Sequence, residues 1–234
     1  MKRTVFAMLI ASVFLVTGCL EDDDYYSLSD AWFGLGIFQE TDSIAGGYRV
    51  VMDNDDVLIP VTSNFNVFHY VKDGDRVLVD YTILDDNSTD GEDATEYYIR
   101  LNSIKKVLMK GILDVTEENN DSIGNDPIKV VDVWLTDSLL NFELKYWGSS
   151  KIHLINLVKQ PGELTSEDQP VELELRHNAN GDGESIPYKA LVSFKLGELK
   201  ITGQDSVQFR VTGMDYDNQE FDYDGVYHYG ENND

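Results

Sequence analysis

The chain has 234 residues, which is long enough for one large domain or two small domains with packed cores. Its 43 Asp and Glu residues against 18 Lys and Arg residues give a formal net charge of -25 at pH 7. Charge of that sign repels phosphate backbones, so nucleic acid is excluded as the expected partner. The chain has a single cysteine, and stability cannot come from an internal disulfide.

The first segment has the parts of a lipoprotein signal peptide. A basic start, Lys2-Arg3, precedes an uncharged apolar stretch from Val5 to Val16. That stretch is shorter than the roughly 20 residues of a membrane span. The next residues, Thr17-Gly18-Cys19, complete a sequence that resembles a lipobox, whose cysteine thiol takes up a diacylglycerol or palmitate-type lipid. We therefore predict a signal peptide at residues 1–18 and a membrane anchor on Cys19.

An acidic run, Leu20-Glu21-Asp22-Asp23-Asp24, follows the cysteine. Like charges repel and extend a segment, so we expect a lipidated acidic tether at residues 19–29. The run also resembles the export signal that directs lipoproteins of the Bacteroidetes to the outer face of the outer membrane. It predicts an outer-membrane protein that faces the cell exterior. The alternative, which can hold at the same time, is a disordered acidic tether that keeps the folded part off the lipid.

Residues 30–110 alternate short apolar runs with turn residues, which is typical of short strands. In the run from Arg76 to Ile83, the residues Val77, Val79, Tyr81 and Ile83 fall on one face, and Lys72-Asp73-Gly74-Asp75 forms the preceding turn. Five short strands in this region favour an OB-like five-stranded barrel. The strands are expected at Ala31 to Phe38, Tyr48 to Met52, Val57 to Val61, Arg76 to Leu84 and Glu96 to Leu101.

The following stretch interrupts the strand pattern. Ser103 can cap a short helix that places Ile104, Val107 and Leu108 on one face and ends at Gly111. Polar and turn-forming residues then dominate, and we expect a linker between two domains at residues 111–126.

Residues 127–230 alternate apolar and polar side chains with a period of two. Seven strands over about 100 residues favour an antiparallel, immunoglobulin-like β-sandwich, so the whole fold is predicted to be all-β. The strands are expected around Ile128 to Leu135, Leu140 to Tyr146, Lys151 to Lys159, Val171 to Leu175, Val192 to Leu196, Val207 to Val211 and Phe221 to Tyr227.

Several segments together resemble the NigD-like lipoprotein family of the Bacteroidetes. They are Val71 to Tyr81, Asp121 to Pro127, Ile155 to Val158 and Leu173 to Asn178. The resemblance implies an amino-terminal OB-like domain followed by a carboxy-terminal β-sandwich, and a lipid anchor. It implies no catalytic residues, and the family name comes from a gene near a bacteriocin locus.

Sequence motifs for catalysis or metal binding are absent or incomplete. The loop from Asn178 to Glu184 loosely resembles the start of a calcium loop but lacks its first aspartate and its distal glutamate, so turn chemistry explains it equally well. No Gly-x-Ser-x-Gly sequence is present. The histidines at 69, 153, 177 and 228 form no metal-binding pair in sequence. We predict no catalytic residue, no metal and no cofactor.

Aromatic side chains are the remaining candidates for ligand contacts, because flat rings stack on sugars and on partner side chains. Tyr97 and Tyr98 lie near a rim of the first domain, and Tyr146 and Trp147 lie at a strand end; packing in the two cores is the alternative role. The sequence favours a non-enzymatic binding or interaction protein with an envelope protein or a glycan as partner. The alternatives are a glycan-acting hydrolase or its accessory subunit, and a bacteriocin-associated or immunity role.

Overall fold

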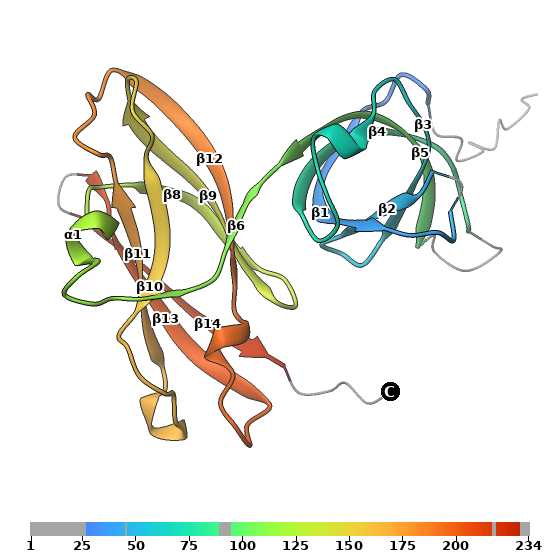
Figure 1. Ribbon diagram of the computed structural model, residues 1–234. Coiled ribbons are helices and arrows are strands. Elements are labelled where there is room, and N and C mark those ends of the chain that lie inside the picture. Colours follow the sequence, from blue (N-terminus) through green and yellow to red (C-terminus); the bar gives the residue numbers. More distant parts are fainter. Residues whose placement is uncertain (1–26, 45, 89–94, 217–218, 230–234) are drawn as a thin grey trace, which may run out of the picture.

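The computed structural model describes residues 27–44, 46–88, 95–216 and 219–229. The fold is all-β, with an amino-terminal barrel and a carboxy-terminal sandwich, as the sequence predicts (Figure 1). The expected signal peptide, Cys19 and most of the tether lie outside the described residues. No helix within the described ranges is long and apolar enough to cross a membrane.

Five strands close the barrel in the order β1-β2-β3-β5-β4. Four of the five strand pairs are antiparallel, and β3 pairs with β5 in parallel. The short 3-10 helix Val67–His69 lies between β3 and β4. The strands are β1 Trp32–Glu40, β2 Tyr48–Met52, β3 Val57–Ser63, β4 Arg76–Asp86 and β5 Glu96–Lys106.

The predicted alternation in β4 is confirmed over its first half. Val77 and Val79 are fully buried in the barrel core, whereas Leu78 and Asp80 are only partly buried. A bulge in the pairing with β5 then shifts the register between Asp80 and Tyr81. Gly74 in the preceding turn has a φ of 78°, a conformation that glycine adopts without a steric penalty.

The prediction of a helix between Ser103 and Gly111 is wrong. Strand β5 continues to Lys106, because Ile104 and Lys106 pair with Val79 and Val77 of β4. The apolar spacing that suggested a helix comes from two strands on either side of a domain boundary. Ile104 packs in the barrel, whereas Leu108 begins strand β6, which belongs to the sandwich.

One residue, Val107, separates the last strand of the barrel from the first strand of the second domain. Strand β6 (Leu108–Lys110) pairs with β12, and β7 (Leu113–Asp114) pairs with β10. The chain therefore changes domain at Val107. The segment expected as a linker, residues 111–126, contributes β7 and the helix α1 (Asn120–Ile123) to the sandwich.

The sandwich has a five-stranded sheet, β14-β13-β11-β10-β7, and a four-stranded sheet, β6-β12-β9-β8. Their inner faces form one core that includes Phe142, Leu157, Phe194 and Phe209. The sequence predicted purely antiparallel sheets, and this prediction is wrong. Both sheets are mixed, because three strand pairs are parallel: β11 with β13, β6 with β12 and β7 with β10. The strands are β8 Lys129–Leu135, β9 Leu139–Gly148, β10 Leu154–Lys159, β11 Val171–Asn178, β12 Ile186–Lys195, β13 Ser206–Met214 and β14 Glu220–His228.

A buried arginine connects the two domains. The side chain of Arg76 in the barrel is 1% exposed and forms a two-pronged ion pair with Asp53 in the β2–β3 turn. It also donates to Asn141 Oδ1 of β9 at 3.1 Å and to Ser193 Oγ of β12 at 3.2 Å. The N–H of Val107 donates to the Arg76 carbonyl at 2.8 Å, so the backbone crossing is fixed at the same residue.

Candidate functional site

The strongest candidate site lies at one end of the sandwich. Strand β9 contributes Tyr146 and β12 contributes Tyr188, and the two residues are directly paired across the ladder. Direct cross-strand pairing brings the side chains into contact, and the two rings stack with centroids 5.7 Å apart and planes 25° apart. The connections after β9 and before β12 border this pair.

Two histidines continue the stack toward the interior. The ring of His153 lies 4.7 Å from Tyr146, and His177 lies 5.0 Å from His153, with interplanar angles of 32° and 33°. Tyr188 is 39% exposed and His177 is 1% exposed. Tyr146 also lies 5.5 Å from His177, so the three inner rings contact one another and Tyr188 stacks on their outer side. We call these four residues, Tyr188, Tyr146, His153 and His177, the ring stack, which extends from the surface into the sandwich.

Hydrogen bonds fix the inner half of the ring stack. His177 Nδ1 lies 3.0 Å from the Pro127 carbonyl, which can only accept, so Nδ1 carries the proton. Neutral His177 then accepts at Nε2 from His153 Nδ1, at 2.9 Å. His153 Nε2 lies 3.3 Å from Asp182 Oδ2, and the two form an ion pair whenever His153 carries both ring protons.

The segment from Asp121 to Pro127 places the carbonyl beneath His177. Arg176 Nε donates to the Gly124 carbonyl at 2.5 Å, and the Asp126 carboxylate accepts from the Ala179 N–H at 2.7 Å. Two of the segments that carry the family resemblance therefore meet at the base of the ring stack.

Asp182 organises the loop that follows β9. Its carboxylate accepts hydrogen bonds from the N–H groups of Ser149, Ser150 and Lys151 at 2.5, 3.0 and 3.2 Å. These bonds, led by that from Ser149, hold the pKa of Asp182 far below its usual range. Lys151 Nζ donates in turn to the Asn180 and Gly181 carbonyls, so the two loops at this end hold each other.

Gly148 allows the histidine and the carboxylate to approach. A Cβ atom at this position would lie 3.0 Å from His153 Nε2 and 3.2 Å from Asp182 Oδ2, closer than side-chain carbons normally come. A glycine at the end of β9 therefore leaves the space in which the His153–Asp182 contact forms.

A polar hollow of about 250 Å³ opens over the ring stack. Two tyrosines, two serines, a lysine and a histidine line it. Burial and the neighbouring Tyr188 raise the pKa of Tyr146, so its hydroxyl remains a donor at neutral pH. The lining residues are Tyr146, Ser149, Ser150, Lys151, His153 and Tyr188.

The acid and base groups beside the hollow already have partners. A serine nucleophile needs a histidine with a free nitrogen, but both ring nitrogens of His153 already have partners. The Asp182 carboxylate is occupied by backbone N–H groups. Across the described ranges, no group of three or more His, Cys, Asp or Glu side chains could hold a metal ion.

The calcium-like pattern at Asn178 to Glu184 has a local explanation. Asn178 Oδ1 accepts from the Asn180 N–H at 2.6 Å, and Asp182 is directed at the neighbouring loop. Oxygen-bearing side chains at alternate positions therefore serve the backbone of two connected turns.

Of the four aromatic candidates, Tyr146 lies in the hollow. Trp147 is the next residue of the strand and contacts Tyr216 and Lys145 instead, with ring centroids 4.7 Å from Tyr216 and Lys145 Nζ 4.8 Å from the ring. Tyr97 and Tyr98 lie in β5 of the barrel, and neither lines this hollow. Sequence reasoning did not identify His153, His177, Asp182 and Tyr188 as a group.

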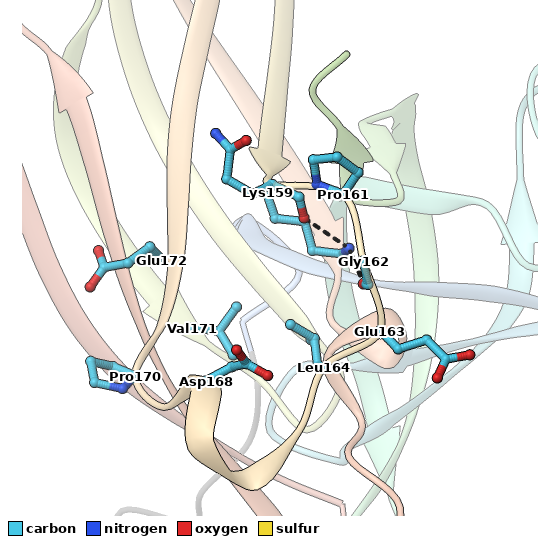
Figure 2. Close-up of a pocket in the computed structure, with 10 residues that line it drawn as sticks. Lys159, Pro161, Gly162, Glu163, Leu164, Asp168, Pro170, Val171 and Glu172 are labelled. Atoms are coloured by element: carbon cyan, nitrogen blue, oxygen red, sulfur yellow. Dashed lines mark hydrogen bonds between the residues drawn. The ribbon is translucent and has the colours of Figure 1, made fainter.

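Figure 2 shows a second hollow, of about 240 Å³, beside the connection between β10 and β11. Its lysine, Lys159, is 9% exposed and already paired with Asp114 at 2.6 Å and with the Gln160 and Gly162 carbonyls. The side chains of Glu163 and Glu172 point away from each other. The polar groups here hold the loop and do not converge on a ligand.

The barrel, the sandwich and the hollow define a two-domain β protein with a ligand-sized site at one end of its second domain. The sequence matches the NigD-like N-terminal OB domain over residues 40–107 and the NigD-like C-terminal beta sandwich domain over residues 111–224. The chain belongs to the NigD-like family.

Solved structures of proteins from Parabacteroides and Bacteroides share the fold. A protein of Parabacteroides distasonis provisionally named as toxin-related is 27% identical, with a TM-score of 0.68 over 85% of this chain and 94% of that chain. A protein of unknown function from Bacteroides vulgatus is 25% identical, with a TM-score of 0.67 over 87% and 93%. A NigD-like immunity protein from Bacteroides caccae is 21% identical, with a TM-score of 0.64 over 88% and 99%. No curated protein matches the chain.

Proposed function

We propose that the protein is a lipid-anchored outer-membrane protein that faces the cell exterior and binds an envelope component or an extracellular ligand without catalysis. The observation that carries the proposal is the hollow over the ring stack. Its outermost ring is exposed, its floor is held by a closed set of hydrogen bonds, and its acid and base groups are already paired. Such a site can hold a ligand in a fixed orientation.

The proposed cellular location rests on the sequence from Val16 to Cys19 and on the acidic run that follows. A structural neighbour from Bacteroides fragilis, provisionally named a lipoprotein, is 10% identical and shares the fold. Cys19→Ala should abolish incorporation of labelled fatty acid, because it removes the acceptor thiol. Protease added to intact cells should digest the wild-type domains, and full protection would contradict an exterior location.

Binding is tested by affinity capture from intact cells with the full-length, lipidated protein as bait. Tyr188→Ala should lose the captured component, because the exposed ring of the hollow is removed. Tyr70→Ala is the matched control, since Tyr70 is a 63% exposed tyrosine on the barrel. Equal capture by both variants would contradict binding at the hollow.

The hydrolase alternative has less support. Glycosidases use two carboxylates on either side of the bond, about 5 to 10 Å apart. No Asp or Glu is among the described residues that line the polar hollow, and the Asp182 carboxylate beside its loop is occupied by backbone N–H groups. Release of reducing sugar from a glycan by the purified full-length protein would favour a hydrolase over a binding protein.

An immunity role is supported by the name of the Bacteroides caccae protein, which shares the fold. Its test is the sensitivity of a gene-deletion strain to toxins from neighbouring strains. Increased killing that the wild-type gene reverses would support this role, and unchanged sensitivity would exclude it.

A further inference from the structure

We infer that the hollow at the end of the sandwich binds a neutral pyranose, with one sugar ring stacked on Tyr188 and its hydroxyls bonded to the surrounding side chains. The inference rests on the proposed function and names the ligand class of the same site. It depends on three features, which are the open end of the ring stack, the unpaired hydroxyls and the charge.

Within the described part of the chain, Tyr188 makes no ring contact other than that with Tyr146. Each of its rings is followed by the next at 4.7 to 5.7 Å, and the sequence of rings stops at Tyr188, which is 39% exposed. The inner rings and their hydrogen bonds fix the orientation of Tyr146, on which Tyr188 rests. The exposed ring is therefore a pre-oriented flat surface, suited to the apolar face of another ring.

Hydroxyl groups border this surface. Within the part of the chain that the structure describes, the hydroxyls of Tyr146, Tyr188, Ser149 and Ser150 have no hydrogen-bond partner in the protein. Each can both donate and accept, as a sugar hydroxyl also does. A ligand with one flat apolar face and hydroxyls around its edge satisfies both features, and a pyranose has this construction.

Charge separates this class from the other flat ligands. A nucleotide or a sulfated or uronic glycan carries negative charge, and the chain carries a net charge of -25. A cationic ligand would need an acidic or purely aromatic enclosure, whereas the described residues that line the hollow include Lys151 and no Asp or Glu. The volume of about 250 Å³ suits one sugar unit of a longer chain that continues into solvent.

The test titrates the detergent-solubilised full-length protein with maltohexaose, cellohexaose, xylohexaose and mannohexaose, and with hexagalacturonate as the acidic comparison. Binding is measured by calorimetry and located by hydrogen exchange. We expect at least one neutral hexasaccharide to bind and to slow exchange in residues 146–153 and 182–190. Tyr188→Ala should weaken that binding at least tenfold, which corresponds to about 1.4 kcal/mol. Tyr188→Phe, which keeps the ring, should weaken it less, and Tyr70→Ala should leave it unchanged.

The inference is overturned if no neutral hexasaccharide binds, if Tyr188→Ala binds as well as wild type, or if hexagalacturonate binds more tightly than every neutral sugar. Failure of the proposed function is distinguishable. If an envelope protein is captured only when Tyr188 is present, and no sugar binds, the proposed binding function stands and the inference of a sugar ligand is overturned. Neither capture nor sugar binding overturns both.

Discussion

Arg76 in the barrel donates a hydrogen bond of 3.1 Å to the side-chain carbonyl of Asn141 in the sandwich. Asn141 Oδ1 also accepts from Ser193 Oγ at 2.6 Å, so one oxygen joins strands from both domains. All three residues are about 1% exposed. A buried, charged connection of this kind resists rotation of one domain against the other, because any movement would leave a polar group unpaired.

Because of this connection, we predict that Arg76→Ala strongly lowers the free energy of unfolding. The substitution leaves the Asp53 carboxylate and the Asn141 carbonyl without their donor, which should lower the free energy of unfolding by about 3 to 5 kcal/mol. Urea unfolding of the full chain measures the change. Arg49→Ala is the control, because Arg49 donates to one side chain, Gln39, within the barrel and should cost about 1 kcal/mol. Equal losses for the two variants would contradict a large contribution of the Arg76 contacts to stability.

The close approach at Gly148 predicts a specific effect of one methyl group. Gly148→Ala places a carbon between His153 and Asp182 and should destabilise the chain by about 1 to 3 kcal/mol. It should also accelerate hydrogen exchange at residues 149–151. Gly197→Ala is the control, since a Cβ atom there meets nothing within 4 Å. Unchanged exchange in the Gly148 variant would mean that the loop does not depend on this contact.

We predict that the free energy of unfolding falls in mild acid, because of His177. Burial lowers the pKa of His177 below its ordinary value of 6.5, and the hydrogen bond to Pro127 offsets only part of that effect. The unfolded chain therefore binds a proton that the folded chain refuses, and the free energy of unfolding should fall as the pH drops below about 6.5 toward the folded pKa.

Urea midpoints measured between pH 7.5 and 5.5 test this expectation. His177→Asn should flatten the dependence on pH, because the buried titrating group is gone. His69→Gln, which changes an exposed histidine in the barrel, should preserve the decline. A decline as steep in His177→Asn as in wild type would assign the effect to another group.

Much of the fold could be predicted because its strands are amphipathic. The spacing of Val77, Val79, Tyr81 and Ile83 on one face identified β4, and the same period of two identified the strands of the sandwich. The rule misses Arg76, which is 1% exposed although the pattern gives no reason to bury it. Its burial depends on Asn141 and Ser193, and no local pattern connects residues 65 and 117 positions away.

The candidate site was harder to predict for the same reason. Tyr146 could be selected as an aromatic residue at a strand end. His153 and His177 are 24 residues apart and meet because β10 and β11 pair with Ile155 opposite His177. Asp182 comes from a loop whose composition indicates only turns. The pairing register of the strands creates the site, and sequence spacing does not contain it.

The most direct test of a binding site at the hollow is photo-crosslinking on intact cells. A photoreactive amino acid replaces Ser150 at the rim of the hollow in one strain and Tyr70 on the barrel in another, in the full-length, lipidated protein. We predict that position 150 cross-links to a discrete component and that position 70 does not. The cross-link at position 150 should be lost in a protein that also carries Tyr188→Ala. No cross-link at position 150, or the same products from both positions, would contradict the account.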